Sequence, residues 1–172
     1  GDTNGHRDIF IQDRQTGVIS RVSVSSVGKQ ASGESWHPSI SADGRFVAFV
    51  SQAVDLVTED ENGDFADVFI HDRQTGTTML VSVSSTGEQG NCLSDTPTIS
   101  ADGRTVAFFS RADNLIIGDM NEAYDIFVHE REGIQPAAIT DLRTQSGPAA
   151  AMANLFWTEP QGVTPSMRYR IR

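Results

Sequence analysis

The chain has 172 residues, 38% of them hydrophobic, and 13 basic against 23 acidic residues give it a net charge of −10. Its length suits one domain or slightly more, and its composition is that of a folded protein rather than a disordered or collagen-like one. The acidity disfavours phosphate backbones and anionic lipids, and no apolar run reaches the ~18 residues of a spanning helix, so we expect neither nucleic-acid binding nor membrane insertion. The single cysteine, Cys92, excludes a disulfide within the chain.

An internal repeat of 58 or 59 residues dominates the sequence. The motif Ser-Ala-Asp-Gly-Arg begins at Ser41 and again at Ser100, and Val-Ala-Phe follows shortly after it both times. Two other motifs recur with the same spacing: Asp-(Ile/Val)-Phe at Asp8, Asp67 and Asp125, and Val-Ser-Val-Ser at Val22 and Val81. A fixed period of this kind indicates a repeat architecture in which each repeat is one supersecondary unit.

Taken along the chain, one repeat predicts four short strands. In the complete repeat, 37–85, the expected strands cover 38–41, 45–51, 67–73 and 79–84, with turns at Asp43-Gly44 and Gln74-Thr75-Gly76. The N-terminal segment supplies only a third and a fourth strand, at 8–14 and 19–25. The last repeat supplies three strands, at 97–100, 105–110 and 125–131.

The lack of helical periodicity and the β-branched and aromatic strands predict an all-β fold of four-stranded antiparallel blades, as in a β-propeller. A plain sandwich is the alternative, but it would not normally repeat words at a fixed spacing. The segments Pro38-Ser39-Ile40-Ser41-Ala42-Asp43-Gly44-Arg45 and Asp67-Val68-Phe69 resemble the TolB-like, WD-repeat-like propeller blades of bacterial secreted and surface proteins. The resemblance covers residues 1–133 and implies a binding platform or an accessory domain of a peptidase.

The expected ring is incomplete. The strands make up about two and a quarter blades, whereas propellers close with about 4–8. Open ends would expose unpaired strand edges, which natural proteins cover or pair. We therefore expect either the rest of a longer chain or further copies of this one to complete the ring, and we favour the longer chain.

The segment 134–172 departs from the repeat and forms the second predicted domain. Its words Pro-Ala-Ala-Ile-Thr-Asp-Leu, Leu-Phe-Trp-Thr-Glu-Pro and Tyr-Arg-Ile resemble the first three strands of a fibronectin type III domain. The resemblance implies that Trp157 is the core tryptophan and that Tyr169 lies on the third strand. A full domain of this type needs about 90–100 residues, so this one would be partial. The alternative is a β-rich tail that packs its tryptophan on the blades.

A polar loop recurs before each third strand and is the clearest candidate for a metal site. Ca²⁺ takes six to eight oxygen ligands, and alternating Asp and Asn in a tight loop can converge on one ion. The middle loop fits best, although no glutamate follows at the twelfth position and the other loops lack an acid at the fifth. Turn capping by Asp and Asn is the alternative. The candidate ligands are Asp60, Asn62, Asp64 and Asp67, with Asp2, Asn4 and Asp8, and Asp119, Asn121 and Asp125.

Catalytic candidates are weaker. His71-Asp72-Arg73 and His129-Glu130-Arg131 correspond to Gln12-Asp13-Arg14, and recurrence favours a structural role because an active site is usually built once. No Gly-x-Ser-x-Gly word anchors a serine hydrolase. Trp36 and His37 precede a first strand, where they would either contact a ligand or pack at the rim.

The sequence therefore predicts a non-enzymatic module at the cell surface, outside the cell or in the periplasm of a bacterial-type secretor. It would bind a protein or a carbohydrate, in adhesion or surface assembly. One alternative is an accessory propeller of a secreted hydrolase whose catalytic domain lies outside this chain. Another is a subunit that polymerises through its open strand edges.

Overall fold

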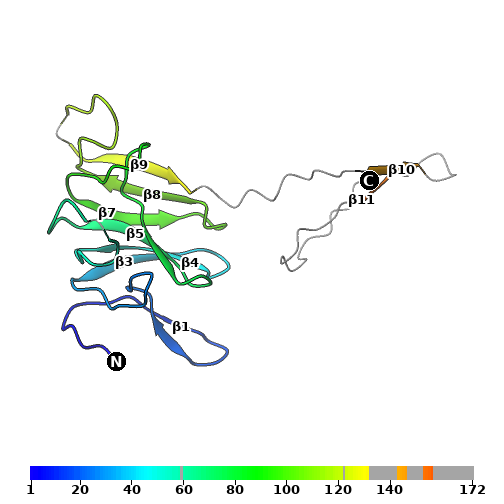
Figure 1. Cartoon of the computed structure of the whole chain (residues 1–172), viewed down its shortest axis with the longest axis horizontal. Coiled ribbons are helices and arrows are strands. Elements are labelled where there is room, and N and C mark those ends of the chain that lie inside the picture. The colour runs from blue at the N-terminus through cyan, green and yellow to red at the C-terminus, as the bar shows by residue number, and fades with distance from the viewer. Residues whose placement is uncertain (59, 122, 132–142, 147–152, 157–172) are drawn as a thin grey trace. The chain divides into compact units, whose positions relative to one another are not determined.

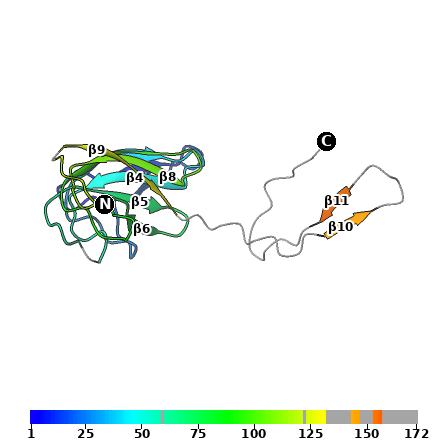
Figure 2. The ribbon, with the colours of Figure 1, turned by 90° about the horizontal axis from the view of Figure 1, so that it is seen from above.

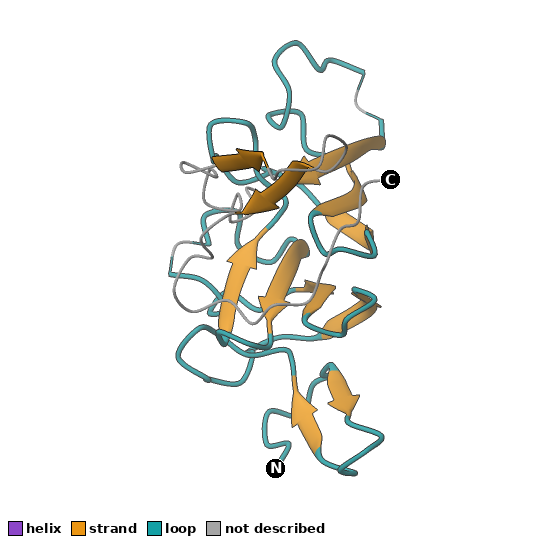
Figure 3. Cartoon of the chain, turned by 90° about the vertical axis from the view of Figure 1, so that its right-hand side faces the viewer, coloured by secondary structure: helices purple, strands orange, loops and turns teal. Residues whose placement is uncertain are grey.

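The structure is a computed structural model that describes residues 1–58, 60–121, 123–131, 143–146 and 153–156. These residues form antiparallel strands and no helix, so the predicted all-β class is confirmed (Figure 3). Accordingly, no helix among them is long and apolar enough to span a membrane. The chain divides into two compact units, Gly1–Arg131 and Glu132–Arg172.

Three sheets make up the first unit. The first sheet pairs β1 (Phe10–Gln12) with β2 (Ile19–Arg21), and the second has the order β3 (Ser35–Ile40), β4 (Phe46–Ser51), β5 (Asp67–Asp72), β6 (Thr77–Leu80). The third sheet has the order β7 (Ser94–Ile99), β8 (Thr105–Ser110), β9 (Asp125–Glu130). Figure 1 shows the sheets following one another along the chain, and Figure 2 shows them overlying one another. These are the expected blades, one of them with all four strands.

The second unit contains one described hairpin. Strand β10 (Arg143–Ser146) pairs antiparallel with β11 (Ala153–Phe156), with Arg143 opposite Phe156. Trp157 and Tyr169, which carry the resemblance to a fibronectin type III domain, lie outside the described residues. That part of the sequence analysis stays a prediction.

The first strands begin three residues earlier than the sequence predicts. β3 starts at Ser35 and β7 at Ser94. The register shifts between Trp36 and Ser39 in β3 and between Asp95 and Thr98 in β7. At the shifts, His37 has φ 48° and Thr96 has φ 52°, a left-handed conformation that side chains other than glycine rarely adopt. The irregular backbone breaks the alternation on which strand prediction depends.

The second sheet is buried on both faces, which explains why its strands read as continuous apolar runs. One face packs on the first sheet, where Phe49 and Phe69 stack with 5.9 Å between ring centroids beside Ile9. The other face presents Val68 and Ile70 to Val106 and Phe108 of the third sheet. Burial of each such side chain contributes about 1.5–3 kcal/mol.

No described sheet packs on the outward face of the third sheet, where Tyr124 contacts Phe109 edge-on at 5.4 Å between ring centroids. Ile126 and Val128 are 72% and 62% exposed, whereas the corresponding residues of β5, Val68 and Ile70, are 0% and 1% exposed. The same strand position therefore lies in the core of one sheet and on the surface of the next.

Phe46 connects the second and third sheets at the end that carries the β3–β4 turn. The guanidinium carbons of Arg45 and Arg131 lie 4.7 Å and 4.0 Å from the centre of its ring. A methyl group on Gly103, in the β7–β8 turn, would overlap this ring. The backbone N–H of Ala42 donates to the carbonyl of Ala101 at 2.9 Å in the same contact. Gly103 is thus fixed by the packing of one sheet on another as well as by its φ of +72°.

We expect Gly103→Ala to reduce the free energy of unfolding by about 1–3 kcal/mol more than Gly44→Ala, measured by urea denaturation. The two glycines occupy the same turn position, with φ of +72° and +71°, so both variants incur the same backbone strain. Only Gly103 faces the Phe46 ring, because an alanine methyl at Gly44 would meet nothing closer than 3.7 Å. Equal destabilisation of the two variants would contradict this account of the contact.

Candidate functional site

The polar loop before β5 forms a hydrogen-bond network centred on Asp67. This aspartate is the first residue of β5 and is 1% exposed. Its carboxylate accepts hydrogen bonds from Ser82 Oγ at 2.7 Å, Gln89 Nε2 at 2.8 Å and Asn62 Nδ2 at 3.0 Å. Gln89 Nε2 also donates to Asp60 at 3.0 Å. The carboxylate therefore ties the loop and β5 to the segment that follows β6.

The first sheet repeats this network. Ser23 Oγ donates to Asp8 at 2.6 Å, and Gln30 Nε2 donates to both Asp8 and Asp2 at 3.1 Å. Asn4 Nδ2 donates to the carbonyl of Ala31 at 2.8 Å, as Asn62 Nδ2 does to that of Gly90 at 2.7 Å. The serine and glutamine donors to the aspartate, and the bond from the asparagine to the connecting segment, therefore recur in both sheets. This recurrence indicates that these contacts belong to the construction of the blade.

The third sheet holds only part of the network. Asn121 Nδ2 donates to Asp125 at 2.9 Å, and the backbone N–H of Asn121 donates to Asp119 at 3.3 Å. Among the described residues, no serine or glutamine contributes a hydrogen bond to Asp125. In the described part of the chain, this sheet therefore has the loop and the carboxylate without the partners that follow a fourth strand in the other sheets.

The structure brings together three of the four calcium-site candidates in the middle loop. Asp60, Asn62 and Asp67 converge, but their contacts run through amide N–H donors, which a cation would have to displace. Asp64 lies apart from this network, on the rim of a cavity described below. Among the described residues, no three His, Cys, Asp or Glu side chains form a set that could hold a metal ion. Calcium binding stays a prediction.

Ser82 and Gln89, with Ser23 and Gln30, are the network members that we did not identify from the sequence. They lie 15 and 22 residues beyond their aspartate, too far to belong to a local motif. Their recurrence with the period of 59 residues was the available signal.

Burial dominates the electrostatics of Asp67. It raises the pKa of this carboxyl to about 6, against the hydrogen bonds from Ser82, Gln89 and Asn62, which lower it. The negative charge of Asp60 adds to the increase. The folded state therefore binds the Asp67 proton more tightly than the unfolded chain does.

The His-Asp-Arg segment at the end of β5 is engaged within the fold. Arg45 donates to both carboxylate oxygens of Asp72, at 2.9 Å and 2.7 Å, and this pairing lowers the pKa of Asp72 to about 2. His71 is buried, its Nδ1 lies 2.8 Å from Thr78 Oγ1, and burial lowers its pKa. Arg73 donates to the carbonyl of Gly44 at 2.6 Å, which joins two turns of the second sheet.

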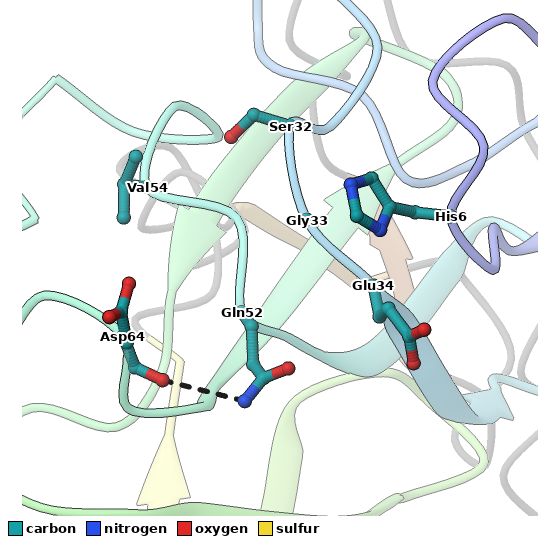
Figure 4. A pocket seen from close by; sticks show the side chains of 7 residues that line it. All are labelled: His6, Ser32, Gly33, Glu34, Gln52, Val54 and Asp64. Carbon is teal, nitrogen blue, oxygen red and sulfur yellow. Dashed lines mark hydrogen bonds between the residues drawn. The ribbon is translucent and has the colours of Figure 1, made fainter.

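A cavity of about 390 Å³ lies at the opposite end of the second sheet from these turns. We name it the loop cavity; it is lined by His6, Ser32, Gly33, Glu34, Gln52, Val54 and Asp64. Figure 4 shows these side chains, which come from the loops before β1, before β3 and after β4. Gln52 Nε2 reaches the carbonyl of Asp64 in a long contact of 3.5 Å.

The wall of the loop cavity depends on a close backbone approach at Gly33. A side-chain carbon there would lie 2.7 Å from the carbonyl oxygen of Gln52, so this position excludes every other residue unless the backbone moves. Arg7 Nε donates to Glu34 at 2.8 Å, and the Arg7 guanidinium carbon lies 5.8 Å from the centre of the Trp36 ring. The loop before β1 is thereby held against the start of β3.

Trp36 and His37, at the start of β3, are not among the residues that line this cavity. His37 Nδ1 is 2.7 Å from Asp95 Oδ1, and Trp36 Nε1 donates to Asp95 Oδ2 at 3.4 Å. These contacts join the first strands of the second and third sheets. Half of the His37 side chain is exposed, at 55%.

The comparisons with known proteins find similar solved structures but no matching sequence family. No protein-family model matches the chain, and no curated protein matches it. Among solved structures, it is similar to a protein assigned as TolB from Agrobacterium tumefaciens, with 17% identity and a TM-score of 0.44, over 72% of this chain and 37% of that one. TolB from Acinetobacter baumannii matches with 18% identity and a TM-score of 0.30, over 72% of this chain and 35% of its own. The chain thus spans well under half the length of both proteins.

We expect the free energy of unfolding of the native chain, relative to that of Asp67→Asn, to rise by about 1 kcal/mol between pH 7 and pH 5. The pKa of Asp67 is raised above its unfolded value of 3.8 to about 6, so protonation in this interval favours the folded state. His71, whose pKa is lowered, acts in the opposite direction but is common to both proteins. Urea unfolding at the two pH values measures the difference. A difference that is constant or falls would contradict the burial of an ionisable Asp67.

Proposed function

We propose that the chain forms part of a non-catalytic β-propeller module whose loop cavity binds a basic segment of a partner polypeptide. The observation that supports this most is the loop cavity itself, an open space of about 390 Å³ on loops that packed sheets hold in place. Apart from Gly33 and Val54, the residues that line it have polar side chains. Binding surfaces are typically built on loops that a rigid scaffold positions.

The charge of the cavity suggests the chemistry of its ligand. Asp64 makes no ion pair with any described residue, and Glu34 has Arg7 as its partner. The whole chain carries a net charge of −10, which attracts cationic groups over a distance. A lysine or arginine side chain of a partner would complement Asp64. A stacked sugar fits less well, because Arg7 lies over the Trp36 ring.

The absence of catalysis is also part of this proposal. The titratable side chains that recur along the chain are used in structural contacts, with Asp72 paired to Arg45 and His71 bonded to Thr78. We further propose that the module acts outside the cytoplasm, at the cell surface or in the periplasm, where its acidic and Ser- and Asn-rich loops face solvent.

Synthetic hexapeptides that contain lysine and arginine, with glutamate-containing peptides of the same length as controls, test this proposal. We expect the basic peptides to shift the amide NMR signals of Gly33 and Gln52. Asp64→Asn should weaken their binding about threefold to tenfold, which corresponds to a loss of about 1 kcal/mol.

Asp102→Asn is the matched control, because it removes the same charge in the β7–β8 turn, away from the cavity. Equal weakening by the two variants would show that only the overall field attracts the peptides. Shifts of the same amides by neutral oligosaccharides, without shifts by the basic peptides, would contradict the proposed ligand class.

A further inference from the structure

Among the described residues, no fourth strand follows β9 in the third sheet, whereas the other two sheets have one. β5 pairs with β6 from Phe69 opposite Leu80 to Asp72 opposite Thr77, and β1 pairs with β2. Within the part of the chain that the structure describes, no strand pairs with the outer edge of β9. The sequence after Arg131 also lacks the Val-Ser-Val-Ser word that follows the third strand in the other repeats.

The groups that a fourth strand would contact are already in place on β9. β9 pairs with β8 in the same register as β5 pairs with β4, so that Ile126 lies opposite Phe109 as Val68 lies opposite Val50. The N–H of Val68 points to the outer edge, where it donates to Ser82 Oγ at 3.2 Å, and the N–H of Ile126 has the equivalent position.

The contacts of Asp125 indicate which side chains a strand at this edge would carry. In the complete networks, one serine hydroxyl donates to the aspartate and accepts the next N–H of the third strand, as Ser23 does between Asp8 and Ile9. A glutamine seven residues after this serine donates to the same aspartate, as Gln89 does to Asp67. Asp125 has its asparagine donor, Asn121, and among the described residues it has neither of these two partners.

We propose that the outer edge of β9 binds an extended polypeptide strand from outside these 172 residues, antiparallel to β9 and with the pattern apolar-Ser-apolar-Ser followed by a glutamine. Backbone pairing with β9 provides affinity, and contacts of the serine and glutamine with Asp125 provide specificity. A second copy would not supply this strand without unfolding, because its own β2 and β6 are paired within its sheets. This surface is separate from the loop cavity, so the proposal does not depend on the proposed function.

A fluorescein-labelled peptide with the sequence of residues 77–90 is the probe, and fluorescence anisotropy with the whole chain measures its binding. This peptide contains the strand, the serine and the glutamine of the complete second blade. We expect saturable binding of one peptide per chain. Ser82→Ala in the peptide and Asp125→Ala in the chain should each weaken it about tenfold, because each removes a hydrogen bond to a charged group.

Two further variants of the chain serve as controls, one expected to leave binding unchanged and one expected to abolish it. Asp102→Ala removes an exposed aspartate elsewhere in the third sheet and should leave peptide binding unchanged. Val128→Pro should abolish binding, because it removes a backbone N–H that points to the outer edge of β9. This N–H corresponds to that of Ile70 in β5, and its loss breaks no hydrogen bond between β8 and β9.

Three results would overturn the proposal. One is the absence of saturable binding to the whole chain, which would show that the edge is already covered. Another is binding that Asp125→Ala and Ser82→Ala do not weaken. The third is a free chain that light scattering shows to be a dimer and that the peptide does not dissociate, because a second copy would then occupy the edge.

Discussion

A buried aspartate at the start of β5, Asp67, organises the second blade of this protein, and Asp8 has the corresponding position in the first. The desolvation of such a carboxylate is costly and has to be offset by hydrogen bonds. In the second sheet, Asp67 receives them from Asn62, in the loop before the strand, and from Ser82 and Gln89, in the segment that follows β6. Satisfying one carboxylate therefore fixes the loop before the third strand and the segment that leads from the fourth strand to the next blade.

This arrangement separates structural polar residues from those available for binding. Side chains that recur with the repeat are engaged by one another, as the two complete networks around Asp8 and Asp67 show. Residues that do not recur, such as His6, Glu34 and Asp64, are left to line the loop cavity. Recognition of a partner thus falls on positions where the repeats differ, while their common positions maintain the scaffold.

The repeated motifs were sufficient to predict the all-β class and the order of the strands. They also grouped Asp60, Asn62, Asp64 and Asp67 as candidate calcium ligands. The period alone does not specify the direction of a hydrogen bond, so it did not predict that the Asn62 amide donates to Asp67. The contact between Gly33 and Gln52 and the left-handed conformations of His37 and Thr96 depend on tertiary packing. The secondary-structure propensities of the residues therefore do not predict this contact or these conformations. Of the four candidate ligands in the middle loop, Asp64 is the one that is exposed and lines the loop cavity, and the sequence does not show this difference.

The most direct test of this account is a comparison of Asp67→Ala with Asp125→Ala by urea denaturation at pH 7. The two aspartates have the same position in their strands, but only Asp67 is buried and bonded to a serine and a glutamine. The account predicts that Asp67→Ala lowers the free energy of unfolding by about 2 kcal/mol, because it leaves buried donors without an acceptor. Asp125→Ala should change it by less than about 0.5 kcal/mol. Similar losses in the two variants would contradict the view that the carboxylate acts through its network.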